Sequence, residues 1–462
     1  MQYEVRPDAS FGWVLGSWVF LVAYVVFIVN VAVDQQPVPL LPTVQTTHRE
    51  WQLSEASNTT IDMCVDFAAH ACDSSKLVHG LNMWQETTHV AFARVEATDL
   101  YRSCVESMLF EPTEVIPLVD DPGSADDWDE TTHVRAVVSA LLLGYSVNGV
   151  LARVSPMNGI HSLHVWHANS RFVHSVPADA TCFAEYLTDH SSLLLHTVVH
   201  SPKSVCALLE LATIAVTPVD YPLSCFDVVT MFGPQQLAAA LDTPHRAVAD
   251  ALANRIAAHM ALPDVAINVG VGKTVIGDTF DPALDIRTMW DARTTLRMGL
   301  VGALVNASLW DANPAMVNAF YDGELNAIFI PQGILWPPFV SECYSDELNL
   351  GTIGFIVAHE LGHARDRRDN DTILLGQVVK DVMALSNASQ LVVEVTAHED
   401  LADYHAAKTL DAMVDLSVVT LLQFASLWCD TTASFSVDVH APGWVRTNEV
   451  VGQLGRWRHR NC

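Results

Sequence analysis

Residues 350–366 read LGTIGFIVAHELGHARD, an apolar run that leads directly into two histidines four residues apart. On a helix, His359 and His363 would lie on the same face one turn apart, where both imidazoles can bind one Zn²⁺. The apolar residues before them predict that this helix is buried, and polar groups in a core need a reason to be there. The stretch therefore predicts a central helix that carries a metal site.

Glu360 follows the first histidine, as in the H-E-x-x-H pattern, in which the glutamate is the general base of a zinc peptidase. Zinc lowers the pKa of a bound water to about 7, and a neighbouring carboxylate can take the proton that this water loses. The motif also arises by chance in chains with many histidines, so its buried context gives it weight. We expect one zinc ion per chain, with Glu360 activating a zinc-bound water.

A catalytic zinc site needs a third protein ligand and an open position. Residues 398–403, HEDLAD, place Glu399 and Asp403 four residues apart, so that on a helix both carboxylates can face the first helix. One would bind zinc, and the other would hold a ligand imidazole in the required tautomer. The alternative is a solvated acidic patch, and the upstream motif favours ligation.

The chain has 462 residues, of which 50% are hydrophobic, and a formal net charge of −29 at pH 7. The length is typical of two or three domains. The charge argues against a nucleic-acid partner, because binding phosphates needs clustered Lys and Arg. It also repels anionic lipid head groups, so a membrane contact requires an apolar anchor.

Residues 11–33, FGWVLGSWVFLVAYVVFIVNVAV, contain no charged side chain. At about 1.5 Å per residue, a helix of this length crosses an apolar core of roughly 30 Å. A cleaved signal peptide is the alternative, but its apolar region is shorter. We therefore expect a cell-membrane protein of single-pass type II, with the rest of the chain extracellular; secretion after cleavage is the alternative.

Cysteines and glycosylation sequons agree with an extracellular location. All nine cysteines follow the apolar run, which fits an oxidising compartment. Four Asn-x-Ser/Thr sequons also follow it, which predicts a glycoprotein. The sequons begin at Asn58, Asn306, Asn370 and Asn387.

The remaining patterns predict a mainly α protein with small β elements. Residues 34–48 are rich in Pro, Gln and Thr, which predicts an extended stalk, and residues 111–130 predict an acidic surface loop. Helical periodicity and hairpin patterns mark five further segments. The helices are expected at 133–143, 234–260 and 285–307, and the hairpins at 161–176, with a turn at 168–170, and at 317–330, with a turn at Asp322-Gly323.

Several short stretches, spread along the chain, together match the pattern of one family. They are CVDFAAHAC at 64–72, LYRSC at 100–104, VNAFY at 317–321, PQGILWPPF at 331–339, the block 354–363, EDLAD at 399–403, Trp428-Cys429 and HAPGWVR at 440–446. In these stretches the chain resembles the neprilysin and endothelin-converting enzyme family of zinc metallopeptidases. The similarity is strong from 317 to 462, patchy from 64 to 104 and weak between.

The resemblance implies a role for each residue that matches a family motif. It implies a thermolysin-like zinc catalytic domain with a helical cap, in which His359, His363 and Glu399 bind zinc and Glu360 is the base. The other implied roles are as follows: Asp366 and Asp403 orient the ligand imidazoles, Asn318 and Ala319 pair with the substrate backbone, His440 steadies the oxyanion, Arg446 binds a substrate carbonyl, and Ile334, Phe339, Phe355, Ile356, Leu427 and Trp428 line an apolar pocket.

The resemblance also implies the domain limits and the cysteine pairs. The expected parts are a cytoplasmic tail (1–10), the anchor (11–33), the stalk (34–48), the first piece of the catalytic domain (49–85), a reduced cap (86–285) and the zinc domain (286–462). The implied disulfides are Cys64–Cys462, Cys72–Cys429 and Cys104–Cys225. Cys182 and Cys206 could pair locally, and Cys343 is left odd.

The chain also departs from the family pattern. Family ectodomains are longer, chiefly in the cap, and Asp400 stands where the family has Asn. The expected function is a zinc endopeptidase that cuts small extracellular peptides on the amino side of hydrophobic residues. The alternative is a catalytically weak ectodomain that acts as a binding or receptor-like protein. A zinc aminopeptidase would need an anchor for the substrate amine, such as Gly-x-Met-Glu-Asn, and the chain has no such segment.

Overall fold

The computed structural model describes residues 42–72, 83–107, 150–157, 160–167, 174–176, 224–429 with short gaps between 271 and 312, and 439–462. The expected anchor at 11–33, the loop at 111–130, the helix at 133–143 and the cysteines at 182 and 206 lie outside these ranges. Among the described residues, no helix combines the length and apolarity needed to cross a bilayer.

Two long helices form the centre of the molecule, α14 (Phe355–Asp369) and α16 (Gln390–Met413), and they pack closely against each other. The quoted stretch forms the first of them, preceded by a buried π-helical turn, η4 (Leu350–Gly354). Residues 355–362 are all buried, as their apolar run predicted. The H-E-x-x-H motif therefore lies on a core helix.

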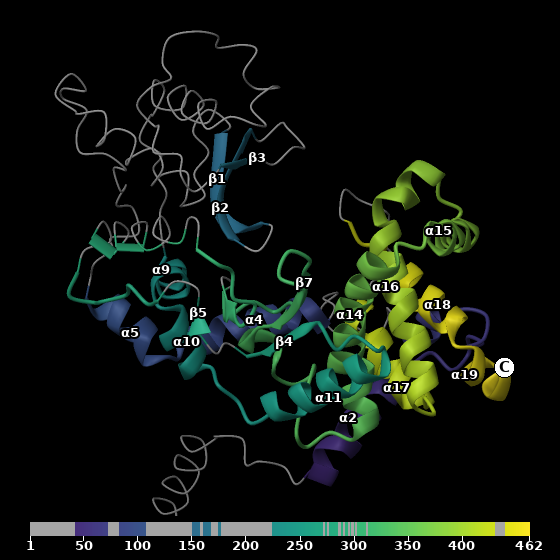
Figure 1. Cartoon of the computed structure of the whole chain (residues 1–462). Helices are drawn as coiled ribbons and strands as arrows, with labels where there is room; N and C mark the ends of the chain where they lie inside the picture. The colour runs from purple at the N-terminus through teal and green to yellow at the C-terminus, as the bar shows by residue number, and fades with distance from the viewer. Residues whose placement is uncertain are drawn as a thin grey trace, which may run out of the picture.

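Further helices surround this pair (Figure 1). α11 (Arg246–His259) packs on α14, while α15 (Thr372–Ser386) and α18 (Gly443–Gln453) pack on α16. Other helices within the described ranges are α2 (Pro42–Ala56), α3 (Phe67–Ala71), α4 (Met83–Glu96), α5 (Asp99–Glu106), α9 (Cys225–Phe232), α10 (Pro234–Ala240), α13 (Asp346–Asn349), α17 (Val418–Ala425), α19 (Gly455–Asn461) and the 3₁₀ turns η3 (Gln332–Ile334) and η5 (Ser426–Trp428).

A small mixed sheet lies against α14, with strand order β4-β8-β7. β4 (Ala266–Val269) runs parallel to β8 (Ala327–Ile330), and β7 (Phe320–Asp322) pairs antiparallel with β8. The hairpin predicted at 317–330 is therefore confirmed, and β7 is the edge strand. Because α11 and β4 share a core with α14, residues on both sides of the domain limit expected at 285/286 pack together.

The second predicted hairpin is part of a separate three-stranded sheet. β2 (Ile160–His167) pairs antiparallel with β3 (His174–Val176), as the pattern at 161–176 predicted. β1 (Val150–Met157), which the sequence pattern did not reveal, pairs along the other edge of β2. A short parallel pair joins β5 (Lys273–Thr274) to β6 (Leu309–Trp310). The described chain is thus mainly helical with few strands, as predicted.

Three expectations about local structure were wrong. Residues 42–48 are not an extended stalk but the first turns of α2, where Thr46 donates to the carbonyl oxygen of Cys343 at 2.9 Å. The helix expected at 234–260 is broken at 241–245, since Pro244 lacks the N–H that a continuous helix needs. The helix expected at 285–307 stops short, because residues 303–307 are not helical.

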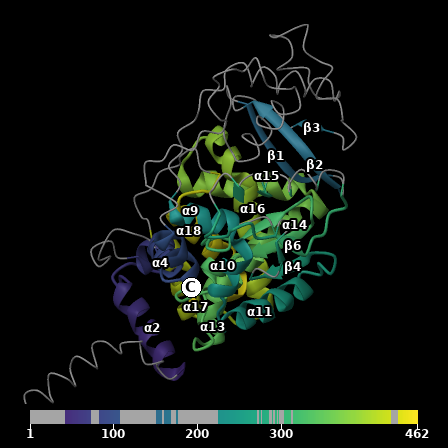
Figure 2. The same cartoon turned by 90° about the vertical axis from the view of Figure 1, so that its left-hand side faces the viewer.

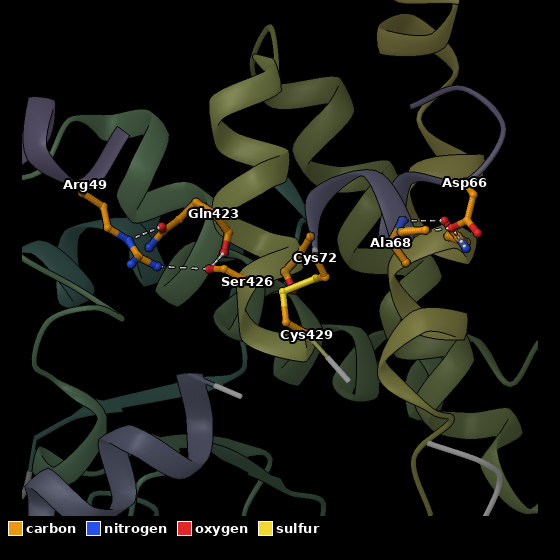
Figure 3. Close-up of a disulfide and its surroundings, with 10 residues drawn as sticks. Arg49, Asp66, Ala68, Cys72, Gln423, Ser426 and Cys429 are labelled. Atoms are coloured by element: carbon orange, nitrogen blue, oxygen red, sulfur yellow. Dashed lines mark hydrogen bonds between the residues drawn. A yellow bond between two sulfur atoms is a disulfide. The ribbon is translucent and has the colours of Figure 1, made fainter. Parts of the chain in front are cut away.

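The N-terminal segment is tied to C-terminal helices, as Figure 3 shows around Cys72–Cys429. Arg49 of α2 donates to Gln423 at 2.8 Å and to Ser426 at 3.1 Å. In both overall views α2 lies at the lower edge of the molecule (Figures 1 and 2). Cys64–Cys462 adds a second bridge between these segments, so residues nearly 400 positions apart share one core.

All three cysteine pairs implied by the resemblance are disulfides in the structure. The third bridge, Cys104–Cys225, joins α5 to α9. Cys343, the odd cysteine, carries a free thiol.

We expect removal of Cys72–Cys429, by Cys72→Ala with Cys429→Ala, to lower the free energy of unfolding by about 4 kcal/mol. With Cys64–Cys462 intact, the bridge closes a loop of roughly 40 residues, from 64 to 72 and from 429 to 462. Removing both bridges should cost more than the two single removals together, because either bridge, when it is the only one of the two present, closes a loop of over 350 residues. Urea unfolding without reductant measures this, with Cys343→Ala as the control. A loss below about 1 kcal/mol would contradict the chain-entropy argument.

Candidate zinc centre

Three side chains from two helices converge at the junction of α14 and α16. His359 Nε2 lies 3.2 Å from His363 Nε2 and 3.1 Å from Glu399 Oε2, and the His363–Glu399 distance is 3.2 Å. Among the described residues, these three form the group whose donor atoms could hold one metal ion. The four-residue spacing of the histidines and the helical position of Glu399 produce this triangle, as the sequence predicted.

The shape of the triangle fits a tetrahedral zinc ion. With metal–ligand bonds of about 2.0–2.1 Å, neighbouring ligand atoms of a tetrahedral site lie roughly 3.3 Å apart. All three observed separations are within about 0.2 Å of that value. Three protein donors also leave the fourth position open, which is the arrangement of a catalytic site and not of a structural one.

A chain of buried hydrogen bonds fixes the first ligand. His359 Nδ1 lies 2.7 Å from Asp403 Oδ1, and Asp403 also accepts two bonds from Arg446, at 2.7 Å from Nε and 2.8 Å from Nη2. Burial alone would raise the pKa of Asp403, but the Arg446 guanidinium and His359 hold it well below its usual range. The carboxylate therefore stays charged and directs Nε2 of His359 towards the metal position.

The charges around the triangle favour a cation in it. Burial opposes a charged His359, but Asp403 and Glu399 outweigh this effect and raise its pKa to about 10. Burial would likewise raise the pKa of Glu399, yet its bonds to His359, His363 and His440 lower it far below its ordinary value. Positive charge, whether a proton or a metal ion, is therefore stabilised at this point.

Glu360 and His440 complete the immediate surroundings. Glu360 is buried, 8% exposed, and its charge acts on His359. His440 precedes α18, and its Nε2 lies 3.3 Å from Glu399 Oε2 with 42% of the side chain exposed. His440 therefore lies beside the third donor of the triangle and is partly open to solvent.

Arg446 is buried, 5% exposed, and has partners within the protein. Its guanidinium lies over the Trp428 ring, 4.1 Å from the centroid, and its described hydrogen bonds use Nε and Nη2. Within the described part of the chain, Nη1 donates no hydrogen bond. Arg446 is thus paired with Asp403, and its Nη1 group remains available for the substrate contact that the resemblance implied.

The expectation that Asp366 orients His363 was wrong. Asp366 Oδ2 instead lies 2.8 Å from Nδ1 of His398, on the neighbouring helix α16. Asp366 follows His363 by three residues on α14. Its side chain points towards α16, where it meets His398, the residue before Glu399. His398 was not predicted as a site residue; its only sequence signal was its position beside a candidate ligand.

Asn318 and Ala319 lie immediately before the edge strand β7. Asn318 is exposed and its Oδ1 accepts from the Ala319 amide at 3.0 Å, while Ala319 is buried. β7 also packs against α14. An extended peptide added to this edge would therefore run alongside the metal-binding helix.

The six residues expected to line an apolar pocket are mostly core. Ile334, Phe339 and Leu427 have no exposed surface, and Phe355 and Ile356 are at most 5% exposed. All five belong to the main hydrophobic cluster around α14, so in this structure they touch other core side chains. Trp428 alone is half-buried. The structure thus places five of the six in the packed core around α14, and their role in lining a pocket stays a prediction.

Two buried carboxyl groups next to Asp403 were not predicted as part of the site. Asp400 is 3% exposed and accepts from Thr396 Oγ1 at 2.7 Å; burial raises its pKa to about 7. Glu449 of α18 is 5% exposed, and burial raises its pKa well above its ordinary value. Both carboxyls can stay neutral where Asp403 must be charged. The departure from Asn at position 400 was the only sequence signal for this cluster.

Asp400→Asn should raise the stability of the metal-free protein, by an amount that grows from about pH 4 to about pH 7. The folded pKa of Asp400 lies above its unfolded value of about 3.9. Between these two values the unfolded chain loses the proton while the folded chain keeps it, so the free energy of unfolding falls as the pH rises and stops falling once the folded pKa is passed. The stability gained by the variant should therefore grow between pH 5 and 7 and then level off at a few kcal/mol, at about 1.4 kcal/mol per pKa unit. Urea unfolding between pH 5 and 8 measures it, with the exposed Asp250→Asn as control. A gain that does not depend on pH would contradict this account.

Comparison with known proteins finds similarity to a known family over the zinc-motif region. Residues 318–421 match the model of Peptidase family M13. The chain is 29% identical over 207 residues to the neutral endopeptidase of Lactococcus lactis subsp. lactis, covering 38% of this chain and 32% of that protein. It is 29% identical over 197 residues to neprilysin of Oryctolagus cuniculus, covering 32% and 26% of the two chains. The matched part thus spans about a third or less of these relatives, and the resemblance to the neprilysin family is confirmed there.

Solved structures support the fold. The Mycobacterium tuberculosis zinc metalloprotease Zmp1 in complex with an inhibitor superposes with a TM-score of 0.50 at 14% identity, covering 86% of this chain and 94% of that one. The Haemonchus galactose-containing glycoprotein complex gives a TM-score of 0.53 at 11% identity, covering 88% and 94%. At such identities the likeness establishes the architecture, which is the thermolysin-like fold that the resemblance predicted.

Proposed function

Starting from the kinship of residues 318–421 with Peptidase family M13, we propose that this chain is a zinc-dependent endopeptidase for small peptides, cutting on the amino side of hydrophobic residues. The observation that carries the proposal is the triangle of His359, His363 and Glu399, with its open fourth position and the buried Glu360 beside it. A single zinc ion fits these donors.

When bound, zinc would act as a Lewis acid towards a water molecule and the substrate carbonyl. Glu360 takes a proton from the water as its oxygen attacks the carbonyl carbon. It then gives that proton to the amide nitrogen as the C–N bond breaks, so that a carboxylic acid and an amine leave. Asp403 keeps His359 in the ligating tautomer throughout, because its carboxylate stays bonded to Nδ1.

The groups on the open side would bind the peptide. The edge of β7 and the residues before it, Asn318 and Ala319, would pair with the substrate backbone as an added strand does. Nη1 of Arg446 would donate to a substrate carbonyl. His440 would donate to the oxyanion that develops as water attacks, which is where a fixed donor contributes most.

The test uses the full chain produced in a secretory host. Zinc per chain is measured by elemental analysis, and cleavage is followed with quenched peptides that carry a central Phe or Leu. One zinc per chain, with cleavage lost to a chelator and restored by zinc, would support the proposal. One zinc without cleavage of any peptide would favour a binding protein, and folded protein that takes up no zinc would contradict the ligand assignment.

For location, we propose a single-pass type II cell-membrane protein with residues 34–462 outside. The apolar run at 11–33, the disulfides and the sequons support this. Asn306, Asn370 and Asn387 are exposed and Asn58 is half-buried, so the surface has room for glycans. Surface labelling of intact cells, combined with glycosidase digestion, tests it. Protein that cells release with a new N-terminus after the apolar run would instead indicate secretion.

A further inference from the structure

The backbones of α14 and α16 approach each other closely at Gly362, between the two zinc-motif histidines. A Cβ atom placed on Gly362 would lie 2.8 Å from the carbonyl oxygen of Ala402 and 3.0 Å from its Cα. Both atoms belong to the backbone of the opposite helix, which cannot rotate away as a side chain can. Ala402 has no exposed surface, so the two backbones are in direct contact here.

The groups of the candidate zinc centre flank this contact on both helices. Gly362 lies three residues after His359 and one before His363, while Ala402 lies three residues after Glu399 and one before Asp403. The bonds from His359 to Asp403, at 2.7 Å, and to Glu399, at 3.1 Å, both cross the same gap. The separation of the helices at this point therefore sets the distance of the third donor from the two imidazoles.

The tolerance of a metal site for such a change is small. Ligand distances in a zinc site need to be met within about 0.2 Å. Any side chain at position 362 would force α16 away from α14 by several tenths of an ångström at Ala402. α16 cannot move freely away from α14, because α15 and α18 pack against it.

We infer that Gly362 is a positioning residue that holds α16 close enough to α14 for Glu399 to complete the zinc site. The inference rests on the proposed zinc-dependent function. It adds that position 362, the variable position before the second histidine of the H-E-x-x-H motif, has to be glycine in this chain. Any side chain there would weaken metal binding although no ligand is changed.

The test measures the zinc dissociation constant of the full chain by competition with a fluorescent chelator. We expect Gly362→Ala to raise this constant about 10- to 100-fold, the range seen when a group that orients a ligand is lost. Two matched glycine variants separate position from general damage. Gly376→Ala, on α15, adds a Cβ with nothing within 4 Å, and Gly351→Ala forces a Cβ to 2.3 Å from the Thr420 carbonyl, away from the zinc ligands. Both should bind zinc as the wild type does.

A double-mutant cycle tests whether the effect runs through Glu399. If it does, Gly362→Ala should weaken zinc binding much less in a Glu399→Ala background than in the wild type. Circular dichroism checks folding, and sucrose at 4 °C stabilises variants that are only marginally folded. Wild-type affinity in Gly362→Ala, or additive effects in the cycle, would overturn the inference while leaving the proposed function intact. A wild type that binds no zinc would instead refute the proposed function, and the inference with it.

Discussion

Glu360→Gln is expected to lower kcat by about 10²- to 10⁴-fold while the chain still binds one zinc ion with nearly unchanged affinity. Glutamine has the size of glutamate but cannot accept the proton that the attacking water loses, and a positioned base contributes about that factor. Glu360 is not among the three converging donors, so metal binding should survive. Steady-state kinetics with a quenched peptide, together with elemental analysis of the same sample, measures both quantities.

The control for this substitution is Glu394→Gln, an exposed glutamate on α16 that should leave kcat and zinc content unchanged. Two results would count against the assignment. If Glu360→Gln lost its zinc, Glu360 would belong to the metal site itself. If the variant kept full activity, another group would have to be the base, and His440 would be the first to examine.

Arg446→Ala should lower the free energy of unfolding by about 3–5 kcal/mol, the usual cost of leaving a buried charge without its partner. Asp403 is 1% exposed and receives both hydrogen bonds of the guanidinium. Among the described residues, its carboxylate would then keep the hydrogen bond to His359 but have no guanidinium to balance its charge. Zinc affinity should fall as well, because Asp403 orients that ligand. Urea unfolding and chelator competition provide the two measurements.

Two further variants show whether the effect arises from the Asp403 pair. Adding Asp403→Asn should recover part of the lost stability, since it removes the unpaired charge. Arg446→Lys should be intermediate, because an ammonium group keeps the charge but lacks the two-pronged geometry. If the double variant were less stable than Arg446→Ala by the full cost of Asp403→Asn alone, the two residues would not be coupled, and packing on Trp428 would explain the loss.

Short, strongly patterned features of the fold could be predicted from the sequence. The apolar run before His359 predicted a buried helix, and the hairpin at 317–330 followed from its turn residues. The break at 241–245 was missed although Pro244 marks it in the sequence. The helical state of residues 42–48 could not be predicted, because it depends on tertiary contacts. Thr46, for example, bonds to the backbone of Cys343, almost 300 residues away. The composition of residues 42–48 does not reveal so distant a partner.

The candidate site divides in the same way. Helical spacing placed His359 and His363 on one face of α14, and Glu399 and Asp403 on one face of α16. That these two faces meet depends on how the helices pack, which only the family resemblance implied. The partner of Asp366 depends on the same packing, and there the role that the resemblance implied was assigned to the wrong imidazole. The buried acids Asp400 and Glu449 come from α16 and α18, and no spacing rule connects them. For the pocket, apolar residues fit both a ligand-binding wall and a core, and only burial distinguishes the two.

The bridges Cys64–Cys462 and Cys72–Cys429 have a consequence for biosynthesis. Synthesis at about 5–20 residues per second separates the emergence of Cys64 and Cys462 by roughly 20–80 s. During that interval Cys64 and Cys72 leave the ribosome as near neighbours without their native partners, and later cysteines can compete for them. Maturation of the chain should thus depend on an enzyme that reshuffles disulfides, and nascent chains should remain inactive until their last helices have emerged and docked.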